Sequence, residues 1–164
     1  LIEEEWNTTV DLKNNLKITF TPARHFSGRK FKRNGTLWTS YVLQTPNQKI
    51  FLGGDSGYDT HFKEIGEQYG PFDFAILENG QYNEAWRYIH ALPEDLPVII
   101  NELKAKHVIP VHSGKFALAK HAWDEPLKKI VESGKANHVD ILTPMIGETL
   151  NLNDSVFSFK EWWK

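Results

Sequence analysis

The sequence predicts a mixed α/β domain in which antiparallel strands are followed by β-α-β units. The first third of the chain carries short runs rich in β-branched and aromatic residues, with turn-forming residues between them. The remainder alternates short apolar runs with stretches whose apolar residues recur at helical spacing. Because 164 residues suffice for one hydrophobic core but not for two, we interpret residues 1–164 as a single domain.

Four strands are expected in the first third of the chain, at residues 8–12, 17–21, 36–45 and 49–52. The polar cluster Lys13-Asn14-Asn15 separates the first two strands, which predicts a hairpin. Gly35 and Pro46 bound the third strand, and a Pro-Asn turn precedes the fourth. These elements account for the antiparallel part of the fold.

Helices and strands alternate in the remainder of the chain. Helices are expected at residues 60–69, 93–106 and 123–133, and strands at 73–77, 107–111, 140–143 and 148–151. Gly70-Pro71 ends the first helix, and Pro97 falls in the first turn of the second, where proline is tolerated. The apolar face of the second helix is expected to consist of Leu96, Ile99, Ile100 and Leu103.

The composition excludes several classes of protein. With 40% apolar and 24% charged residues and a net charge of −2, the chain is globular, and we expect no nucleic-acid partner. It has no cysteine, which excludes disulfides, thiolate metal sites and a cysteine nucleophile and fits the reducing cytoplasm, where peripheral contact with a membrane stays open. The basic run Arg29–Arg33 is interpreted as a solvated loop, with a site-edge loop that attracts an anionic substrate as the alternative.

Polar residues directly follow several of the expected strands. Asp55 lies in a GGDSG turn, Glu78-Asn79 follows the strand at 73–77, and His112 follows the strand at 107–111. His25 lies where the chain leaves the strand at 17–21. Since strand ends in a layered α/β protein converge on one rim, these side chains are expected to meet there. Two imidazoles and a carboxylate are ligand types for zinc and related divalent metals.

The other histidines have less distinctive surroundings. His61, His121 and His138 are interpreted as surface or capping residues, and His107 as a structural residue that begins a strand.

Four stretches together resemble the metallo-β-lactamase fold superfamily: TPARHFSGR, GGDSGYDTHFKEIGEQYGPFDFAILENGQYN, IHALPED and PVHSGKFALAKHAWDEP. Within it they are most similar to the branch that contains N-acylphosphatidylethanolamine phospholipase D and its bacterial hydrolase relatives. The resemblance runs in the right order over residues 16–150. It implies that the chain is the second half of a four-layer αβ/βα sandwich.

The resemblance also implies roles for individual residues. His25 corresponds to a ligand of the first metal, Asp55 to the carboxylate that bridges two metals, and His112 to a ligand of the second metal. Asp55 and His90 are the implied catalytic residues, and His90 lies beside the metals to assist the substrate or the leaving group. Two zinc ions are expected in the complete enzyme, with other divalent metals as alternatives. The candidates for the pocket wall are Glu78, Asn79 and Tyr82.

The sequence departs from the family in two respects. The motif H-x-H-x-D-H, which supplies two ligands to each metal and lies in the N-terminal half of relatives, does not occur in it. We therefore interpret the chain as a partial domain and expect it to pack against the missing half or a symmetry-related chain. Relatives often have an aromatic residue after the histidine that aligns with His112, whereas this chain has Ser113.

The sequence thus favours a metal-dependent hydrolase that uses a hydroxide activated by two metals on a small-molecule or lipid-like phosphodiester. A lactonase of the same fold is one alternative. A non-catalytic fragment that only completes the fold with a partner chain is another.

Overall fold

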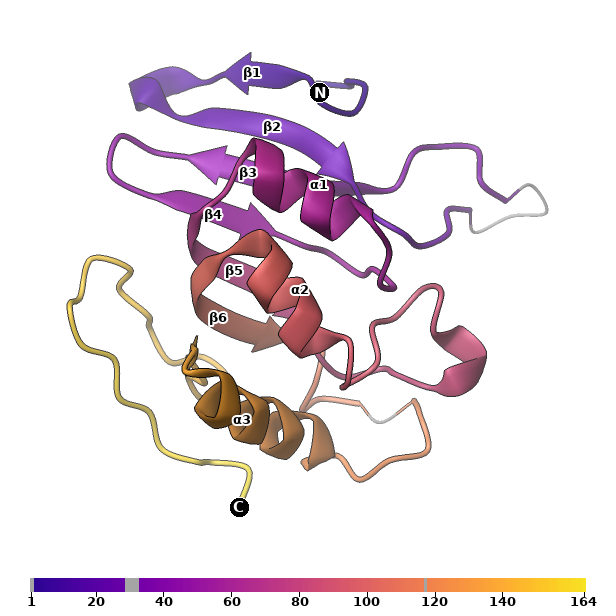
Figure 1. Cartoon of the computed structure of the whole chain (residues 1–164), viewed down its shortest axis with the longest axis vertical. Coiled ribbons are helices and arrows are strands. Elements are labelled where there is room, and N and C mark those ends of the chain that lie inside the picture. Colours follow the sequence, from indigo (N-terminus) through magenta and orange to yellow (C-terminus); the bar gives the residue numbers. More distant parts are fainter. Residues whose placement is uncertain (1, 29–32, 117) are drawn as a thin grey trace.

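The computed structural model describes residues 2–28, 33–116 and 118–164, so most of the basic run at 29–33 lies outside the described residues. Across the described part of the chain, seven strands form one sheet in which every strand pairs with the next along the sequence (Figure 1). These strands are β1 (Thr9–Asp11), β2 (Lys17–Pro22), β3 (Thr39–Gln44), β4 (Lys49–Leu52), β5 (Phe72–Glu78), β6 (Ala105–Val111) and β7 (Asp140–Ile141).

The sheet changes from antiparallel to parallel at β4. Strands β1 to β4 pair antiparallel, whereas β4 to β7 pair parallel. The parallel strands are connected by α1 (His61–Gln68), α2 (Leu96–Leu103) and α3 (Glu125–Asn137), all of which lie in front of the sheet in Figure 1. The expected order of antiparallel strands followed by β-α-β units is confirmed, as is the α/β class.

The main core lies between the helices and the sheet. The predicted apolar face of α2 is buried, with Leu103 fully enclosed. It packs against the alternate residues of the parallel strands that point toward the helices, because side chains in a strand alternate between the two faces of a sheet. The largest buried side chains in this core include Phe51, Phe72, Ile99, Val108 and Ile130.

The opposite face of the sheet is covered in part by the chain's own C-terminal segment. A second cluster centred on Ile50 and Phe74 packs there, and the C-terminal residues Phe157 and Phe159 lie against it. His107 stacks on Phe74, with ring centroids 5.1 Å apart, and meets Phe157 edge-to-face, with centroids 5.3 Å apart, so it is a structural residue. Tyr41 on β3 stays only half-buried on the same side. This second face of the sheet is therefore only partly covered.

Several predicted boundaries differ from the observed ones. The helix expected at residues 93–106 ends at Leu103, because Lys104 adopts a left-handed conformation (φ 54°) that closes the last turn, and β6 begins at the next residue. The strand expected at 148–151 is wrong: Glu148 instead closes a turn with Met145 through its backbone N–H and its carboxylate.

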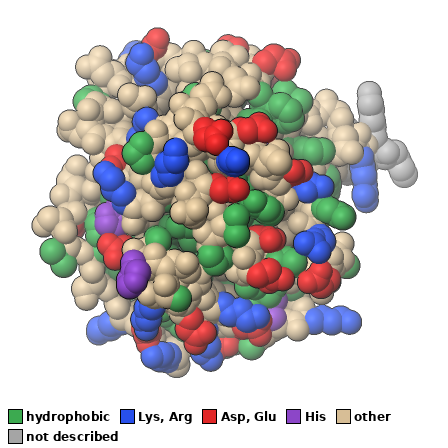
Figure 2. All heavy atoms as spheres, in the orientation of Figure 1, with side chains coloured by type: hydrophobic (Ala, Val, Ile, Leu, Met, Phe, Trp, Pro, Cys, Tyr) green, Lys and Arg blue, Asp and Glu red, His purple; other side chains and the backbone are tan. Residues whose placement is uncertain are grey.

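The surface carries charges of both signs. Figure 2 shows acidic and basic side chains interspersed over the helical face, in agreement with the small net charge. None of the helices in the described residues combines the length and apolar character that a membrane crossing requires.

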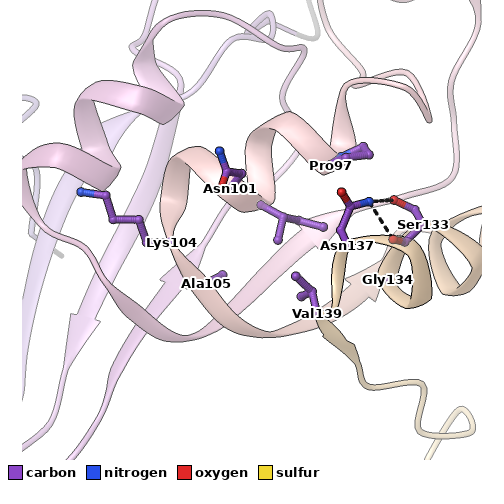
Figure 3. A pocket seen from close by; sticks show the side chains of 9 residues that line it. Pro97, Asn101, Lys104, Ala105, Ser133, Gly134, Asn137 and Val139 are labelled. Carbon is purple, nitrogen blue, oxygen red and sulfur yellow. Dashed lines mark hydrogen bonds between the residues drawn. The ribbon is translucent and has the colours of Figure 1, made fainter.

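A hollow of about 270 Å³ lies between α2 and α3 (Figure 3). Asn101, Lys104, Ala105 and Asn137 are among the residues that line it. Ala105 begins β6, whereas His112 follows the end of that strand. The hollow and the candidate ligands therefore lie at opposite ends of the sheet.

Candidate metal centre

The candidate ligands come from loops at one edge of the sheet. His25 follows β2, Asp55 follows β4, Glu78 ends β5 and His112 follows β6. In Figure 1 the loops after these strands all emerge on the right-hand side of the sheet. His90 lies in the loop between β5 and α2, which returns to the same edge. The expected convergence of strand ends is observed.

Distances show that five of the predicted residues form one cluster. The Nε2 atom of His112 lies 3.7 Å from Oδ2 of Asp55. The ring of His90 has its centroid 5.3 Å from that of His25 and 5.5 Å from that of His112. Glu78 also belongs to the cluster, since one ligand atom each of Glu78, His90 and His112 lies within 4.8 Å of the others.

The backbone at His112 is held in an unusual conformation. His112 has a φ of 67°, in the left-handed region that residues other than glycine and asparagine seldom adopt. Gly80 makes this possible, because a Cβ atom there would lie 2.3 Å from the carbonyl oxygen of His112. The N–H of Asn79 also donates to the carbonyl oxygen of Val111 at 2.8 Å. The loop after β5 therefore fixes the direction of the His112 side chain.

A hydrogen-bond network links the loop of His25 to the loop of Asp55. The Arg24 N–H donates to Ser56 Oγ at 2.9 Å, and the Gly57 N–H donates to the Arg24 carbonyl at 2.9 Å. The Ser56 hydroxyl donates to the Gly57 carbonyl, so the 3.2 Å contact between Ser56 Oγ and His61 Nε2 requires a proton on that nitrogen. His61 thus donates a hydrogen bond to Ser56, the residue that follows Asp55.

Two histidines differ from their predicted surface roles. His61 is buried, with 8% of its surface exposed, and burial lowers its pKa to about 4. Its position four residues before Ile65 on α1 places it on the buried helix face, a signal that the sequence contains. His121 stacks on Tyr82 and hydrogen-bonds to the Gly80 carbonyl at 2.6 Å. His138 caps α3 as expected.

Glu78 and His90 form a buried pair. His90 Nδ1 lies 2.6 Å from Oε2 of Glu78, and the Ala91 N–H donates to Oε1 at 2.7 Å. Burial raises the pKa of the Glu78 carboxyl, and the hydrogen bond from His90 opposes that rise. Burial acts to lower the pKa of His90, but the hydrogen bond and the negative charge of Glu78 outweigh it and raise that pKa.

Asn79 and Tyr82 each donate a hydrogen bond to α3. Asn79 Nδ2 donates to the Pro126 carbonyl at 3.0 Å, and the Tyr82 hydroxyl donates to Glu125 Oε1 at 2.8 Å. Burial, together with Glu125, raises the pKa of Tyr82. Their predicted roles in a pocket wall stay predictions.

The donor set fits a divalent metal. His112 and Asp55 are half-exposed and lie beyond hydrogen-bond range of each other, and two ligands roughly 2.0–2.2 Å from one ion lie about 3–4 Å apart. The Nδ1 atom of His25 lies 3.1 Å from the Phe26 carbonyl, which leaves Nε2 for a metal. Metal-binding histidines typically make such a backbone contact with the ring nitrogen that does not bind the metal. The assignment of His25, Asp55 and His112 as ligands agrees with these contacts and stays a prediction.

Comparison with known proteins shows the family. The family described as "Beta-lactamase superfamily domain" matches residues 1–113, which include all five clustered residues. The chain belongs to the metallo-β-lactamase superfamily. This is a family with metal-dependent hydrolases among its members.

Individual relatives extend over different parts of the chain. An uncharacterized protein of Mycobacterium tuberculosis is 35% identical over all of the chain, which spans 44% of that protein. The mitochondrial N-acyl-phosphatidylethanolamine-hydrolyzing phospholipase D of Saccharomyces cerevisiae is 34% identical over 79% of the chain and 30% of its own length. The metallo hydrolase Igni18 of Ignicoccus hospitalis has the same fold, with a TM-score of 0.67, 21% identity, and coverage of 97% of this chain and 61% of its own. The chain thus spans less than half the length of the Mycobacterium and Saccharomyces proteins and 61% of Igni18.

The buried His61 makes the stability of the fold depend on pH. Its pKa is about 4 in the folded protein and about 6.5 when unfolded, so the unfolded chain takes up a proton first as the pH falls. We expect His61 to cost about 2 kcal/mol of the free energy of unfolding between pH 8 and pH 5. Urea unfolding at both pH values should show a correspondingly smaller loss in His61→Gln. Equal losses in the two proteins would contradict this assignment.

Zinc binding tests the ligand assignment. We expect His112→Asn to weaken zinc binding by about 100-fold or more, because an amide replaces one of the few imidazole donors. Asparagine tolerates the left-handed backbone, so the fold should survive. His138→Asn is the matched control, since His138 is also left-handed (φ 57°) and caps α3. Competition with a chromophoric chelator measures both affinities, and equal affinities would remove His112 from the site.

Proposed function

We propose that the chain is the C-terminal half of a metal-dependent hydrolase that cleaves a phosphodiester with the aid of two zinc ions. The observation that carries the proposal is the convergence of His25, Asp55 and His112 at one edge of the sheet, with His90 beside them. The choice of phosphodiester is supported by the yeast relative, whose name describes a phospholipase D. Imidazole and carboxylate donors favour zinc among the common divalent metals.

Three residues of the cluster would bind the metals, and His90 would contact the substrate. His25 and His112 would each hold a metal through an imidazole nitrogen, and Asp55 would span two metals with its two carboxylate oxygens. Paired divalent ions supply a water of lowered pKa and polarise the phosphoryl oxygen. His90 in its protonated form, with Nδ1–H bonded to Glu78, would donate a hydrogen bond from Nε2–H to an oxygen of the substrate, where negative charge develops as the bond to the leaving group breaks. Against the effect of burial, the hydrogen bond and charge of Glu78 raise the pKa of His90 and so favour this form.

We propose further that the remaining ligands belong to a preceding half of the domain, which packs on the incompletely covered sheet face. Phe20 and Tyr41 form an edge-to-face pair on this face, with ring centroids 5.4 Å apart, and both are only half-buried. They line a groove together with Leu37, which is 45% exposed. Apolar surface of this kind is stabilised by burial against another layer. The fraction of the Mycobacterium relative that the chain spans, 44%, is consistent with this arrangement.

A hydrolysis assay on the zinc-loaded protein together with its preceding half tests the function. We expect hydrolysis of bis-p-nitrophenyl phosphate, and we expect Asp55→Asn to lower kcat/KM by about 100-fold or more, because it removes charge stabilisation at the reacting phosphoryl group. Asp11→Asn, at an exposed site on β1, is the matched control and should retain full activity.

The same protein should be offered a phosphorylated lactone. Opening of the lactone without cleavage of the phosphodiester would replace the proposed activity with that of a lactonase. Hydrolysis of neither substrate, with zinc bound, would contradict the proposal.

A further inference from the structure

We infer that Glu78 is a positioning residue that holds a proton of His90 on Nδ1 and thereby directs the opposite nitrogen, Nε2, toward the candidate metal ligands. The contribution to catalysis rests on the function proposed above, whereas the orientation of the ring stands on the geometry of the pair alone. This role replaces the pocket wall that the sequence suggests for Glu78.

Both oxygens of Glu78 are already engaged. Oε2 pairs with His90 Nδ1 at 2.6 Å, and Oε1 accepts the Ala91 N–H at 2.7 Å. The residue is 5% exposed. Coordination of a metal or contact with a substrate would break one of these short hydrogen bonds inside the protein, where the orphaned donor would have no water to replace the carboxylate. Glu78 therefore acts through its neighbours and not on the ligand itself.

The sheet sets the position of the carboxylate. Glu78 is the last residue of β5 and pairs in parallel register with Val111, the residue before His112. Its carboxylate thus starts from the strand end next to a candidate ligand. It reaches two consecutive residues of the following loop, the ring of His90 and the backbone of Ala91. This double attachment fixes the direction of the ring as well as its place.

The backbone of His90 is held independently. The His90 N–H donates to the Trp86 carbonyl at 3.0 Å, at the end of the short 3₁₀ turn Glu84–Trp86. With the backbone fixed there, rotation of the side chain is the remaining freedom, and the Glu78 hydrogen bond removes it. A ring flipped by 180° would place a carbon atom against the carboxylate in place of Nδ1.

The second ring nitrogen of His90, Nε2, remains available to interact with a substrate or a metal. His90 Nε2 has no hydrogen-bond partner among the residues that the structure describes. The ring lies nearly parallel to that of His112, at 28°, and edge-on to that of His25, at 73°. An imidazole whose Nδ1–H is donated to a carboxylate has a defined tautomer, and its second nitrogen has a defined direction.

Histidine-ring nitrogen NMR on the metal-free chain tests the tautomer directly. At a pH where His90 is neutral, the wild type should carry the proton on Nδ1. Glu78→Gln should reduce that population, because the amide offers a single acceptor oxygen to two donors, the His90 ring and the Ala91 N–H. Glu102→Gln is the matched control. The Glu102 carboxylate on α2 accepts a hydrogen bond from the Tyr58 hydroxyl, so this substitution should leave the His90 signals unchanged. A proton on Nε2 in the wild type would overturn the inference.

A double-mutant cycle on the zinc-loaded protein, assayed together with its preceding half, tests the consequence for catalysis. Glu78→Gln should lower kcat by about 10- to 100-fold with little change in KM. In a His90→Ala background the same substitution should have no further effect, because Glu78 acts through His90. Additive losses would overturn the inference. Thermal unfolding of each variant shows whether the chain is still folded, and Glu78→Asp, which keeps two acceptor oxygens, should recover part of the activity.

The two proposals can fail separately. If phosphodiester hydrolysis is absent but the wild type carries its proton on Nδ1, the proposed function fails and the orientation of His90 stands. If hydrolysis is present and the proton lies on Nε2, the function stands and the role of Glu78 fails.

Discussion

Parallel pairing between β5 and β6 is the constraint on which the arrangement of the cluster depends. The register places Glu78 opposite Val111, so the residue after each strand leaves the sheet at the same level. The pairing of β4 with β5 brings the loop of Asp55 to the same edge. Because parallel strands must all end on one side, three short apolar strands suffice to gather residues that lie up to 57 positions apart in the sequence. A slip of one residue in this register would turn Glu78 to the other face of the sheet.

The loops add what the register cannot supply, namely the direction of each side chain. Ser56 and His61 tie the loop of Asp55 to the exit of β2, and Gly80 lets the loop after β5 approach His112. These contacts are made inside the protein, where a hydrogen bond left without a partner is costly. Residues that are not themselves candidate metal ligands, such as Ser56 and Gly80, therefore determine where the candidate metal ligands lie.

The sequence predicted those features that are encoded in local pattern. Alternation and helical periodicity predicted the order of β1 to β7 and of the three helices, with β7 shorter than the expected strand at 140–143, and turn-forming glycines marked Asp55. The strand expected at 148–151 was wrong because its one apolar residue, Leu150, packs on the sheet face while the segment pairs with no strand among the described residues. The pairing of Glu78 with His90 could not be predicted, since a separation of 12 residues across an irregular loop has no periodic signature. The burial of His61 was encoded in the spacing of α1, yet its polar neighbours favoured a surface interpretation.

The left-handed backbone at His112 sets the stability of the fold against the presence of an imidazole at this position. A glycine would adopt φ 67° without steric penalty and would give the more stable fold, whereas a histidine there retains strain of about 1 kcal/mol or more. Mutational drift toward stability would thus favour losing the imidazole. The imidazole of His112 therefore carries a cost in folding stability, which metal binding at its nitrogen would offset in the metal-loaded protein.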